Sequence, residues 1–467
     1  MRGTERYLTG SEPSLNCKSS RVRFFSPSGT AAWQTHCFKM NLSKEQLGYG
    51  RCVVANPKFL QELSLDRTAI VDLIKNLPEN LWIIKGLEIL DLSKADIEEL
   101  PSSIERLIDL TSLTLRYCEN LVSLPNIICN LKLLKSLDLF GCLKFRNLPK
   151  NIGNVKEHLN LSGNDFVSLP ESMSQLSNLR RLHLEGCKLL WSLENVPSTI
   201  DSVIANNCTS LMRLPELQFY TFRSDHSHLN FQCVNCFSLA RYIGSSGSML
   251  QGQSGKLPGI FDIIIPEGHF LEGRFPKRFE HESLSHELKV QVPYGRDELM
   301  GIEFCICFSV AEASKYFLLT CCIKVNGFES ASPIRSSFRA NYGRVSSRHL
   351  CQLYLSARYF NSQWGVNFRQ IDGNGSNKIE IRISTSNNLE VEKVGIHYDN
   401  INDSASKSTQ NKRSHDEDVG VGPFGEGYSF DEPPSKTRKF WTALLDVFAV
   451  VYNRVDSYDD SHIGSTT

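Results

Sequence analysis

Apolar residues recur along the middle of the chain in one repeated phrase, LxxLxLxx(C/N/T). The phrase occurs seven times between Leu60 and Pro215, and its second apolar position falls at Leu63, Leu90, Leu113, Leu137, Leu159, Leu182 and Val203. These positions are 27, 23, 24, 22, 23 and 21 residues apart, a period typical of leucine-rich-repeat solenoids. One repeat cannot bury its own apolar edge, so several must stack before any of them is stable.

Each copy of the phrase predicts one short strand and a turn. A further apolar residue follows two places on, so both side chains point to the same face of the strand. Three places beyond it stand small or hydrogen-bonding residues: Thr68, Ala95, Cys118, Cys142, Asn164, Cys187 and Cys208. We expect these side chains to turn the backbone and to satisfy amide groups of neighbouring repeats. In the fifth copy Lys156 replaces the first leucine, which predicts an irregular strand or a shortened loop.

Leu-Pro steps recur after the strands, as at Leu124-Pro125 and Leu169-Pro170. Proline fixes its own φ and favours an extended residue before it, so the chain should leave the strand layer in a bend. The residues that follow are enough for one or two helical turns on the convex side. The repeats therefore predict an α/β solenoid, a leucine-rich-repeat horseshoe with parallel strands.

The pattern divides the rest of the chain into further segments. Residues 1–56 show no period and remain unassigned, with poor order expected near a terminus. The repeats occupy 57–215, and 216–258 contain runs of small polar residues that predict a linker. Over 259–400, alternating apolar runs bounded by Gly, Pro and Asn predict an antiparallel β-sandwich or jelly roll.

The last segment, 401–467, opens with NDSASKSTQNKRSHDEDVG and predicts a mostly disordered tail. One amphipathic helix is predicted within it at 439–452. Short basic runs near Lys412 and Lys436 are candidate nuclear localisation signals, although such runs in a tail are usually only solvated. The predicted location is cytoplasmic, with the nucleus left open.

Composition limits the partners. With 51 basic and 51 acidic side chains, the chain has no global field that would draw it onto nucleic acid or an acidic membrane, so neither partner is predicted. The opening MRGTERYLTG is charged, and no segment approaches the roughly 20 apolar residues of a membrane span. Of fifteen cysteines, four share one position of the repeats, and others lie in apolar strand-like runs. That usage suits a reducing, intracellular compartment.

Strings that resemble catalytic or metal motifs do not complete one. HESLSH places His281 and His286 five residues apart, whereas a zinc-binding helix needs a spacing of four. Cys233 and Cys236 form a single CxxC without a second pair, which favours packed thiols over zinc. GQSGKL around Lys256 lacks the first glycine and the hydroxyl of a phosphate loop. We therefore predict no enzyme activity, no cofactor and no metal.

The concave strand face is the candidate binding site, since side chains that alternate with the inner leucines point outward there. The candidate protein-binding residues are Arg116, Asp138, Phe140, Asn160, Arg181, His183 and Glu185. An exposed Phe140 beside Arg116 has the composition of an interface anchor, although a single exposed Phe is also ordinary. In the sandwich, the polar loop 267–287 and residues 359–364 are further candidates.

Two longer strings resemble a known family. LTSLTLRYCENLVSLPNIICNL and LKSLDLFGCLKFRNLPKNIGNV resemble the repeats of plant intracellular immune receptors of the Toll/interleukin-receptor, nucleotide-binding, leucine-rich-repeat class. NFQCVNCFSLAR resembles the entry to their post-repeat jelly-roll domain, called C-JID. That domain's IPxWFxHQS signature is only partly matched, because GHFLEGRFPKR is inserted and the tryptophan is absent. The resemblance covers about residues 57–400, the C-terminal half of such a receptor without its two N-terminal domains.

In that family the repeats and the jelly roll bind a pathogen protein. The resemblance therefore implies a non-enzymatic recognition module that senses a pathogen effector for the defense response. An alternative is a truncated regulatory or decoy partner that docks onto full-length receptors. Both functions imply a protein ligand, either a pathogen effector or another immune receptor.

Overall fold

The computed structural model describes sixteen ranges of the chain. They are 39–41, 61–64, 85–146, 148–149, 152, 155–215, 227–239, 259–267, 279, 281–292, 299–310, 316–330, 332–339, 348–368, 376–386 and 389–400. The predictions for the tail at 401–467, including the helix at 439–452, lie outside these ranges, as does most of 1–56.

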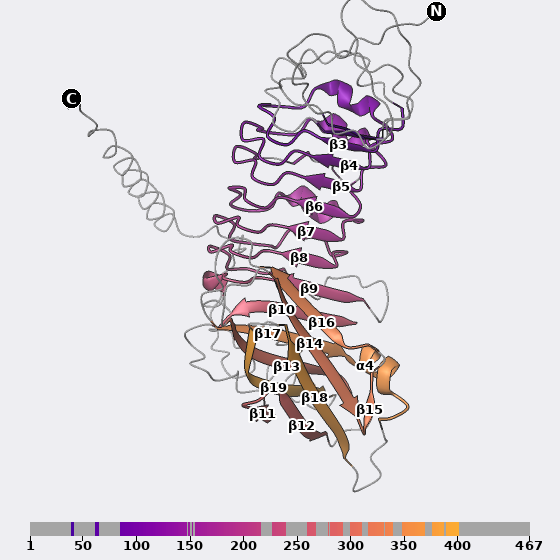
Figure 1. Cartoon of the computed structure of the whole chain (residues 1–467), viewed down its shortest axis with the longest axis vertical. Helices are drawn as coiled ribbons and strands as arrows, with labels where there is room; N and C mark the ends of the chain where they lie inside the picture. Colours follow the sequence, from indigo (N-terminus) through magenta and orange to yellow (C-terminus); the bar gives the residue numbers. More distant parts are fainter. Residues whose placement is uncertain are drawn as a thin grey trace, which may run out of the picture. The chain divides into compact units, whose positions relative to one another are not determined.

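Short parallel strands stack through the first part of the fold (Figure 1). They are β1 (Lys39–Asn41), β2 (Glu62–Ser64), β3 (Ile89–Asp91), β4 (Ser112–Thr114), β5 (Ser136–Asp138), β6 (His158–Asn160), β7 (Arg181–His183) and β8 (Ser202–Ile204). The second apolar position of each repeat lies opposite that of the next, from Leu63 against Leu90 to Leu182 against Val203. The predicted leucine-rich-repeat solenoid is confirmed.

Within the described ranges, three 3-10 helices lie between the strands. They are η3 (Ser102–Arg106), η4 (Asn126–Asn130) and η5 (Glu171–Gln175). Each begins directly after the proline of a Leu-Pro step, and that proline is extended, with φ near −65°. Each helix buries one apolar residue: Ile104, Ile128 or Met173. The predicted helical turns are thus present as single short 3-10 segments.

Of the two alternatives raised by Lys156, the fifth repeat has a regular strand, and the loop before that strand is shortened. β6 pairs in parallel and in register with both β5 and β7. Val155 is fully buried, and its amide donates to the Ile152 carbonyl as that of Leu131 does to Ile128 in the preceding repeat. Lys156, at the position of the missing leucine, is exposed.

A ladder of six side-chain hydrogen bonds joins seven successive repeats, from the second to the eighth. We call the apolar residue two places after the second apolar position of each repeat the inner residue. The donors are Cys or Asn residues three places after the inner residue, and we call that place the slot position. Each donates to the inner carbonyl of the preceding repeat: Cys118 to Leu92 (3.3 Å), Cys142 to Leu115 (3.0 Å), Asn164 to Leu139 (2.9 Å), Cys187 to Leu161 (3.2 Å), Cys208 to Leu184 (3.1 Å) and Cys236 to Ala205 (3.0 Å). Burial raises the pKa of the Cys187 and Cys236 thiols, so they remain neutral donors. The slot thus satisfies carbonyls that the solenoid buries.

One residue in each repeat adopts a left-handed backbone, two places after the inner apolar residue. We call this the turn position. It holds Lys94, Tyr117, Gly141, Gly163, Gly186, Asn207 and Asn235, with φ between 57° and 74°. Glycine and asparagine reach this conformation at little cost, whereas lysine and tyrosine do not. Two repeats therefore carry strain that the other five avoid.

An eighth repeat lies inside the range predicted as a linker, 216–258. Strand β9 (His228–Gln232) pairs in parallel with β8 and places Phe231 opposite Val203. Cys233 and Cys236 then take the inner and slot positions, and both are buried. Residues 227–239 therefore continue the solenoid, and the CxxC string is part of the repeat phrase.

The sheet of the solenoid runs without a break into the sandwich (Figure 1). Strand β10 (Ile260–Pro266) is parallel to β9, and β17 (His349–Ser356), β13 (Leu299–Val310), β19 (Leu389–Asn400) and β11 (His281–Ser283) follow as antiparallel neighbours. A second antiparallel sheet holds β12 (Glu287–Val292), β18 (Asn377–Thr385), β14 (Tyr316–Val325), β15 (Phe328–Glu329) and β16 (Ile334–Arg339). The predicted β-sandwich is confirmed, and it shares one sheet with the solenoid.

The core of the sandwich includes a short helix, α4 (Ala357–Trp364). Its N-cap Ser356 accepts a hydrogen bond from the Tyr359 amide at 3.1 Å. Within the range 359–364, which we expected to offer a binding surface, Tyr359, Phe360 and Trp364 are buried and fill the core, whereas the three residues between them are half-buried or exposed. None of the helices in the described ranges is long and apolar enough to cross a membrane.

Asn164 tests the slot ladder. Its amide nitrogen donates to Leu139 at 2.9 Å and to Leu161 at 2.8 Å, and the residue is fully buried. We predict that Asn164→Ala, which leaves both carbonyls without this donor, lowers the free energy of unfolding by about 1–3 kcal/mol. Asn164→Cys restores the residue type of the adjacent repeats and should cost less than half as much. Urea-unfolding midpoints measure both, and equal losses for the two variants would contradict the ladder.

Candidate protein-binding surface

The seven predicted residues lie on the outward side of the parallel strands, which we call the strand face. Arg116 and Arg181 are exposed, and Phe140 and His183 are half-buried. Asp138, Asn160 and Glu185 are only 6%, 6% and 7% exposed. These three side chains therefore offer little area to a partner.

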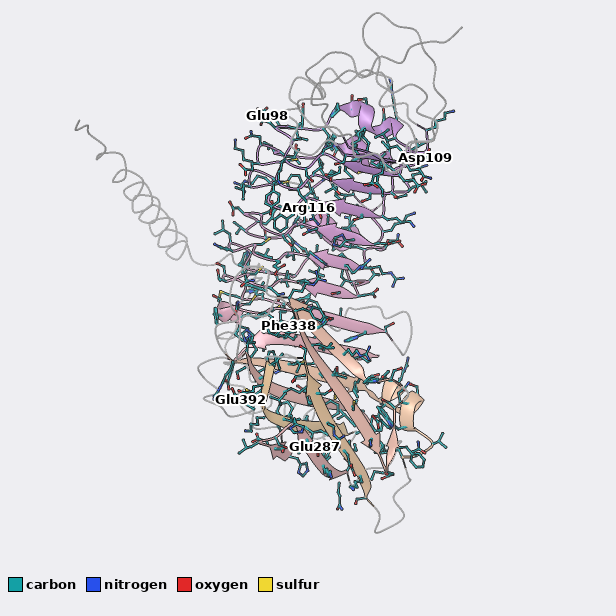
Figure 2. All side chains as sticks on the ribbon, viewed as in Figure 1. Glu98, Asp109, Arg116, Glu287, Phe338 and Glu392 are labelled. Atoms are coloured by element: carbon teal, nitrogen blue, oxygen red, sulfur yellow. The ribbon has the colours of Figure 1, made fainter. Side chains whose placement is uncertain are left out.

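Asp138 is the centre of a polar network on the strand face. Both Nε and Nη2 of Arg116 lie 2.7 Å from Asp138 Oδ2. Oδ1 of the same carboxylate accepts hydrogen bonds from the Asn160 side chain at 3.0 Å and from the Phe140 amide at 3.1 Å. Arg116, labelled in Figure 2, is therefore held in one orientation while half of its side chain stays exposed.

Tyr117 extends this site and was not predicted from the sequence. Its ring packs edge-on against Phe140, with centroids 5.0 Å apart, and Lys94 Nζ lies 5.7 Å from the ring centroid. The residue is 45% exposed and occupies the strained turn position. We call Arg116, Tyr117 and Phe140 the aromatic anchor. Aligning the repeats at the turn position would have revealed Tyr117, because the five repeats that follow carry Gly or Asn there.

Two histidines lie next to each other further along the strand face. His158 and His183 pack edge-on with centroids 4.6 Å apart, and His158 Nδ1 lies 3.3 Å from Ser136 Oγ. Burial lowers the pKa of His183 most, and together with the charges of His158, Arg181, Arg116 and Arg339 it brings that pKa to about 4. Burial also lowers the pKa of His158. Both rings are therefore neutral near pH 7.

Strand β16 of the sandwich lies against the last strands of the solenoid. The Asn206 side chain donates to the Arg339 carbonyl at 3.3 Å, and the Gln232 side chain donates to the Ser337 carbonyl at 2.7 Å. These amides belong to the strand face of the seventh and eighth repeats. The sandwich therefore borders the strand face directly, and the two parts form one continuous surface.

A buried ion pair lies at the same junction. Asp262 of β10 is fully buried, and its Oδ1 lies 2.7 Å from His228 Nε2 and 2.9 Å from Asn230 Nδ2. Burial acts to lower the pKa of His228, but the hydrogen bond to Asp262 and the negative charge of that carboxylate outweigh it and raise the pKa. The pair links the last repeat to the first strand of the sandwich.

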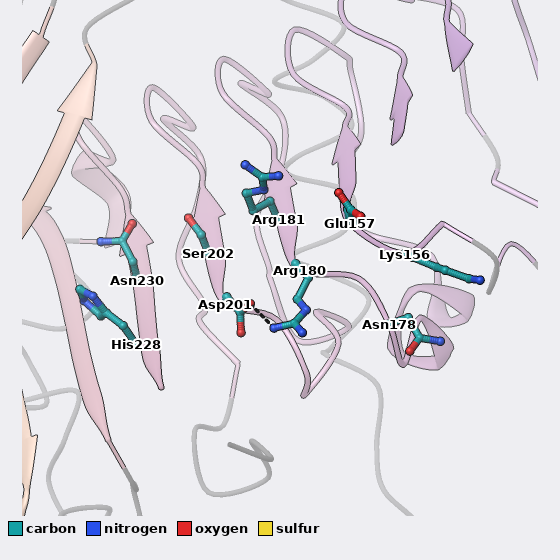
Figure 3. A pocket seen from close by; sticks show the side chains of 9 residues that line it. All are labelled: Lys156, Glu157, Asn178, Arg180, Arg181, Asp201, Ser202, His228 and Asn230. Carbon is teal, nitrogen blue, oxygen red and sulfur yellow. Dashed lines mark hydrogen bonds and ion pairs between the residues drawn. The ribbon is translucent and has the colours of Figure 1, made fainter. Parts of the chain in front are cut away.

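A pocket of about 710 Å³ opens at the edge of the solenoid where β6 to β9 begin (Figure 3). It is lined by Lys156, Glu157, Asn178, Arg180, Arg181, Asp201, Ser202, His228 and Asn230. We call it the rim pocket. All of its lining side chains are polar, which is unlike the mostly apolar lining of small-molecule sites. Arg181 belongs both to this pocket and to the predicted strand-face residues.

The histidines and cysteines singled out as metal candidates have other neighbours. His281 Nε2 lies 3.3 Å from the Tyr398 hydroxyl. Over the ranges that the structure describes, no three His, Cys, Asp or Glu side chains come together in a way that could hold a metal ion.

Comparison with known proteins places these features in a family context. No family model matches the chain. Disease resistance protein RPS4B of Arabidopsis thaliana is 25% identical over 335 residues, which cover 62% of this chain and 28% of that protein. TMV resistance protein N of Nicotiana glutinosa is 26% identical over 324 residues, covering 66% of this chain and 28% of that protein. The chain thus spans about a quarter of the length of these relatives.

Among solved structures, the leucine-rich-repeat domain of the type III effector XCV3220 (XopL) is 22% identical and covers 47% of this chain and 74% of its own, with a TM-score of 0.36. The leucine-rich-repeat ectodomain of the receptor kinase GASSHO1/SCHENGEN3 from Arabidopsis thaliana is 19% identical, covers 42% of this chain and 28% of its own, and has a TM-score of 0.24. At these scores the likeness adds nothing to the fold described above.

The ladder of parallel strands and its repeat phrase define this chain as a leucine-rich-repeat protein. Its relatives, RPS4B and N among them, are plant disease resistance proteins of the Toll/interleukin-receptor, nucleotide-binding, leucine-rich-repeat class, and the predicted resemblance to that class is confirmed over the repeat region.

The environment of His183 predicts a pH dependence. The folded chain should not protonate this ring until pH 4 is approached, whereas the unfolded chain protonates it near pH 6.5. The stability that depends on the neutral ring is therefore complete above pH 6.5 and is lost as the pH falls toward 4. We predict that His183→Gln removes part of this loss, on the order of 1–3 kcal/mol.

Histidine NMR resonances followed against pH measure the effect directly. The His183 ring should titrate with a midpoint near 4. A His183 midpoint at or above 6.5 would contradict the buried, cation-flanked environment.

Proposed function

We propose that this chain is the non-enzymatic recognition part of an intracellular plant immune receptor and that its strand face binds a pathogen effector protein. The observation that carries the proposal is the aromatic anchor. It places an exposed tyrosine, a half-buried phenylalanine and a fixed arginine side by side on the face where solenoids hold their partners.

The strain at Tyr117 supports a functional role for the anchor. A non-glycine residue in the left-handed region costs on the order of 1 kcal/mol, and such strain clusters at ligand-binding sites. Asn207 and Asn235 hold the same turn position without that cost. Tyrosine and arginine are also the residue types enriched among interface hot spots. The tyrosine is therefore better explained by binding than by folding.

The surface around the anchor is continuous enough for a protein partner. The strand face from β3 to β9 adjoins the rim pocket through Arg181 and adjoins β16 through Asn206 and Gln232. A specific protein interface buries about 1,200–2,000 Å² in total, and several adjacent strands are needed to supply half of that. The stacked repeats together with the sandwich edge provide them.

The cysteines support an intracellular site of action. All twelve cysteines within the described ranges are free thiols, and six lie at slot or inner positions of the repeats. Secreted domains generally use cysteine for disulfides, whereas a reducing compartment keeps thiols free. The relatives named disease resistance proteins suggest the plant defense response as the process.

The anchor can be removed without disturbing the repeats. We predict that Tyr117→Asn combined with Phe140→Ala weakens effector binding at least about tenfold, because hot-spot truncations cost 2 kcal/mol or more. Asn is chosen because Asn207 and Asn235 already adopt the turn conformation. Melting temperature should stay within a few degrees of the unchanged chain.

Ile108→Ser provides the matched control, because Ile108 is 62% exposed but lies beyond η3 and outside the strand face. Binding is measured by displaying the full chain against a panel of plant-pathogen effector proteins, with a photo-crosslinker at Phe140 to locate the contact. Equal binding by the anchor variant and the control would overturn the proposal. Crosslinking only to full-length plant receptors would replace it with the regulatory or decoy function.

A further inference from the structure

The rim pocket contains two departures from the repeat phrase. Lys156 stands at the first apolar position of the fifth repeat, and His228 stands at the same position of the eighth. Both side chains line the pocket, together with Arg180 and Arg181 of the sixth repeat (Figure 3). The solenoid therefore replaces core leucines by basic residues twice, and both replacements open onto one cavity.

The charges of the rim pocket are only partly paired. Arg180 Nη1 lies 2.8 Å from Asp201 Oδ2, and Glu157 lies 3.7 Å from Lys135 Nζ, outside the pocket. His228 is paired with the buried Asp262. The side chains of Lys156 and Arg181 form no ion pair or hydrogen bond with any other residue that the structure describes. Two exposed cations thus remain available to a ligand.

The neutral lining residues suit a peptide backbone. The Asn178 and Ser202 side chains make no hydrogen bond to other described residues, and each offers both a donor and an acceptor. The pocket crosses β6 to β9, a distance of about 15 Å at the usual strand spacing of about 4.8 Å. Roughly five extended residues would cover that distance.

The two carboxylates argue against a nucleic acid. Glu157 and Asp201 are 50% and 41% exposed at their side chains, so they would repel the closely spaced phosphates of a polynucleotide. A peptide, unlike a polynucleotide, can carry charges at separate positions, so its carboxylates can lie beside Lys156 and Arg181 and away from Glu157 and Asp201. The mixture of charges therefore selects a segment with spaced acidic residues.

We propose that the rim pocket binds an extended acidic segment of the partner protein, with one carboxylate on Lys156 and another on Arg181. The proposal rests on the proposed function, since it names a chemical feature of the partner that the strand face recognises. Arg181 lies on both surfaces, so a partner seated on the aromatic anchor reaches the rim pocket along the same strand layer.

The test uses the full chain and a fluorescein-labelled peptide of about ten residues that alternates Glu and Gly. The unchanged chain should bind this peptide, and the affinity should fall as salt is raised, because the cations are exposed. Lys156→Glu with Arg181→Glu should weaken binding at least about tenfold, as expected when two exposed ion pairs become repulsive. The milder Lys156→Gln with Arg181→Gln should give an intermediate loss.

Lys132→Glu with Lys188→Glu is the matched control. Both lysines are exposed, lie outside the pocket and change the net charge of the chain by the same amount. The control should bind the Glu-Gly peptide as the unchanged chain does. Equal losses in the control and pocket variants, or no binding of the peptide at all, would overturn the proposal. Tighter, pocket-dependent binding of a single-stranded oligonucleotide would also overturn it.

The two sets of variants distinguish failure of the rim-pocket proposal from failure of the proposed function. If the rim pocket is wrong but the strand face binds an effector, the anchor variant loses effector binding, and Lys156→Glu alone, which leaves the strand-face residue Arg181 unchanged, keeps it. If the strand face binds no effector, the anchor variant changes nothing, whatever the peptide does.

Discussion

The structure depends on each repeat burying its inner face against its neighbours. The leucines at the second and inner positions are almost wholly buried, and they lie opposite their equivalents in the next strand. The same stacking buries the carbonyls of the inner positions, which must then find donors. A thiol or amide at the slot position supplies one from the following repeat. Apolar burial and this ladder therefore act together, and neither forms in a single repeat.

Stacking leaves the outward side chains free to carry function. The outward side chains of Asp138 and Asn160 form a hydrogen bond between neighbouring strands, and Asp138 also orients Arg116. Tyr117 is also exposed, and its left-handed backbone is strained. At the edge of the strand layer, Lys156 is exposed where most other repeats bury an apolar residue. Tyr117 and Lys156, which belong to the two candidate binding features, thus lie at positions where the residue type differs from that of most other repeats.

The sequence was sufficient for the elements that follow from local periodicity. The positions of Leu63 to Val203 predicted seven strands in register, and alternating runs predicted most strands of the sandwich. The eighth repeat was not predicted, because it lies 28 residues after the seventh and carries Phe231 and Cys233 where leucines are usual. A period cannot reveal a repeat that changes both its spacing and its residue types.

Non-local features could not be predicted. The contacts of Asn206 and Gln232 with β16 join residues more than a hundred positions apart. Nothing in the local pattern around Tyr359 and Trp364 shows that they fill the sandwich core. Likewise, Asp138 and Glu185 alternate correctly with the leucines, yet their neighbours bury them. Alternation gives the direction of a side chain, whereas its exposure depends on what packs beside it.

Hydrogen exchange on the full chain, with and without a bound effector, tests the central claim most directly. The account holds that the strand face and the adjoining edge of the sandwich form one recognition surface. It predicts that binding slows amide exchange over 112–117, 136–140, 181–185 and 334–339 together. Slowing confined to the 3-10 segments η3, η4 and η5, with none over these strands, would contradict it.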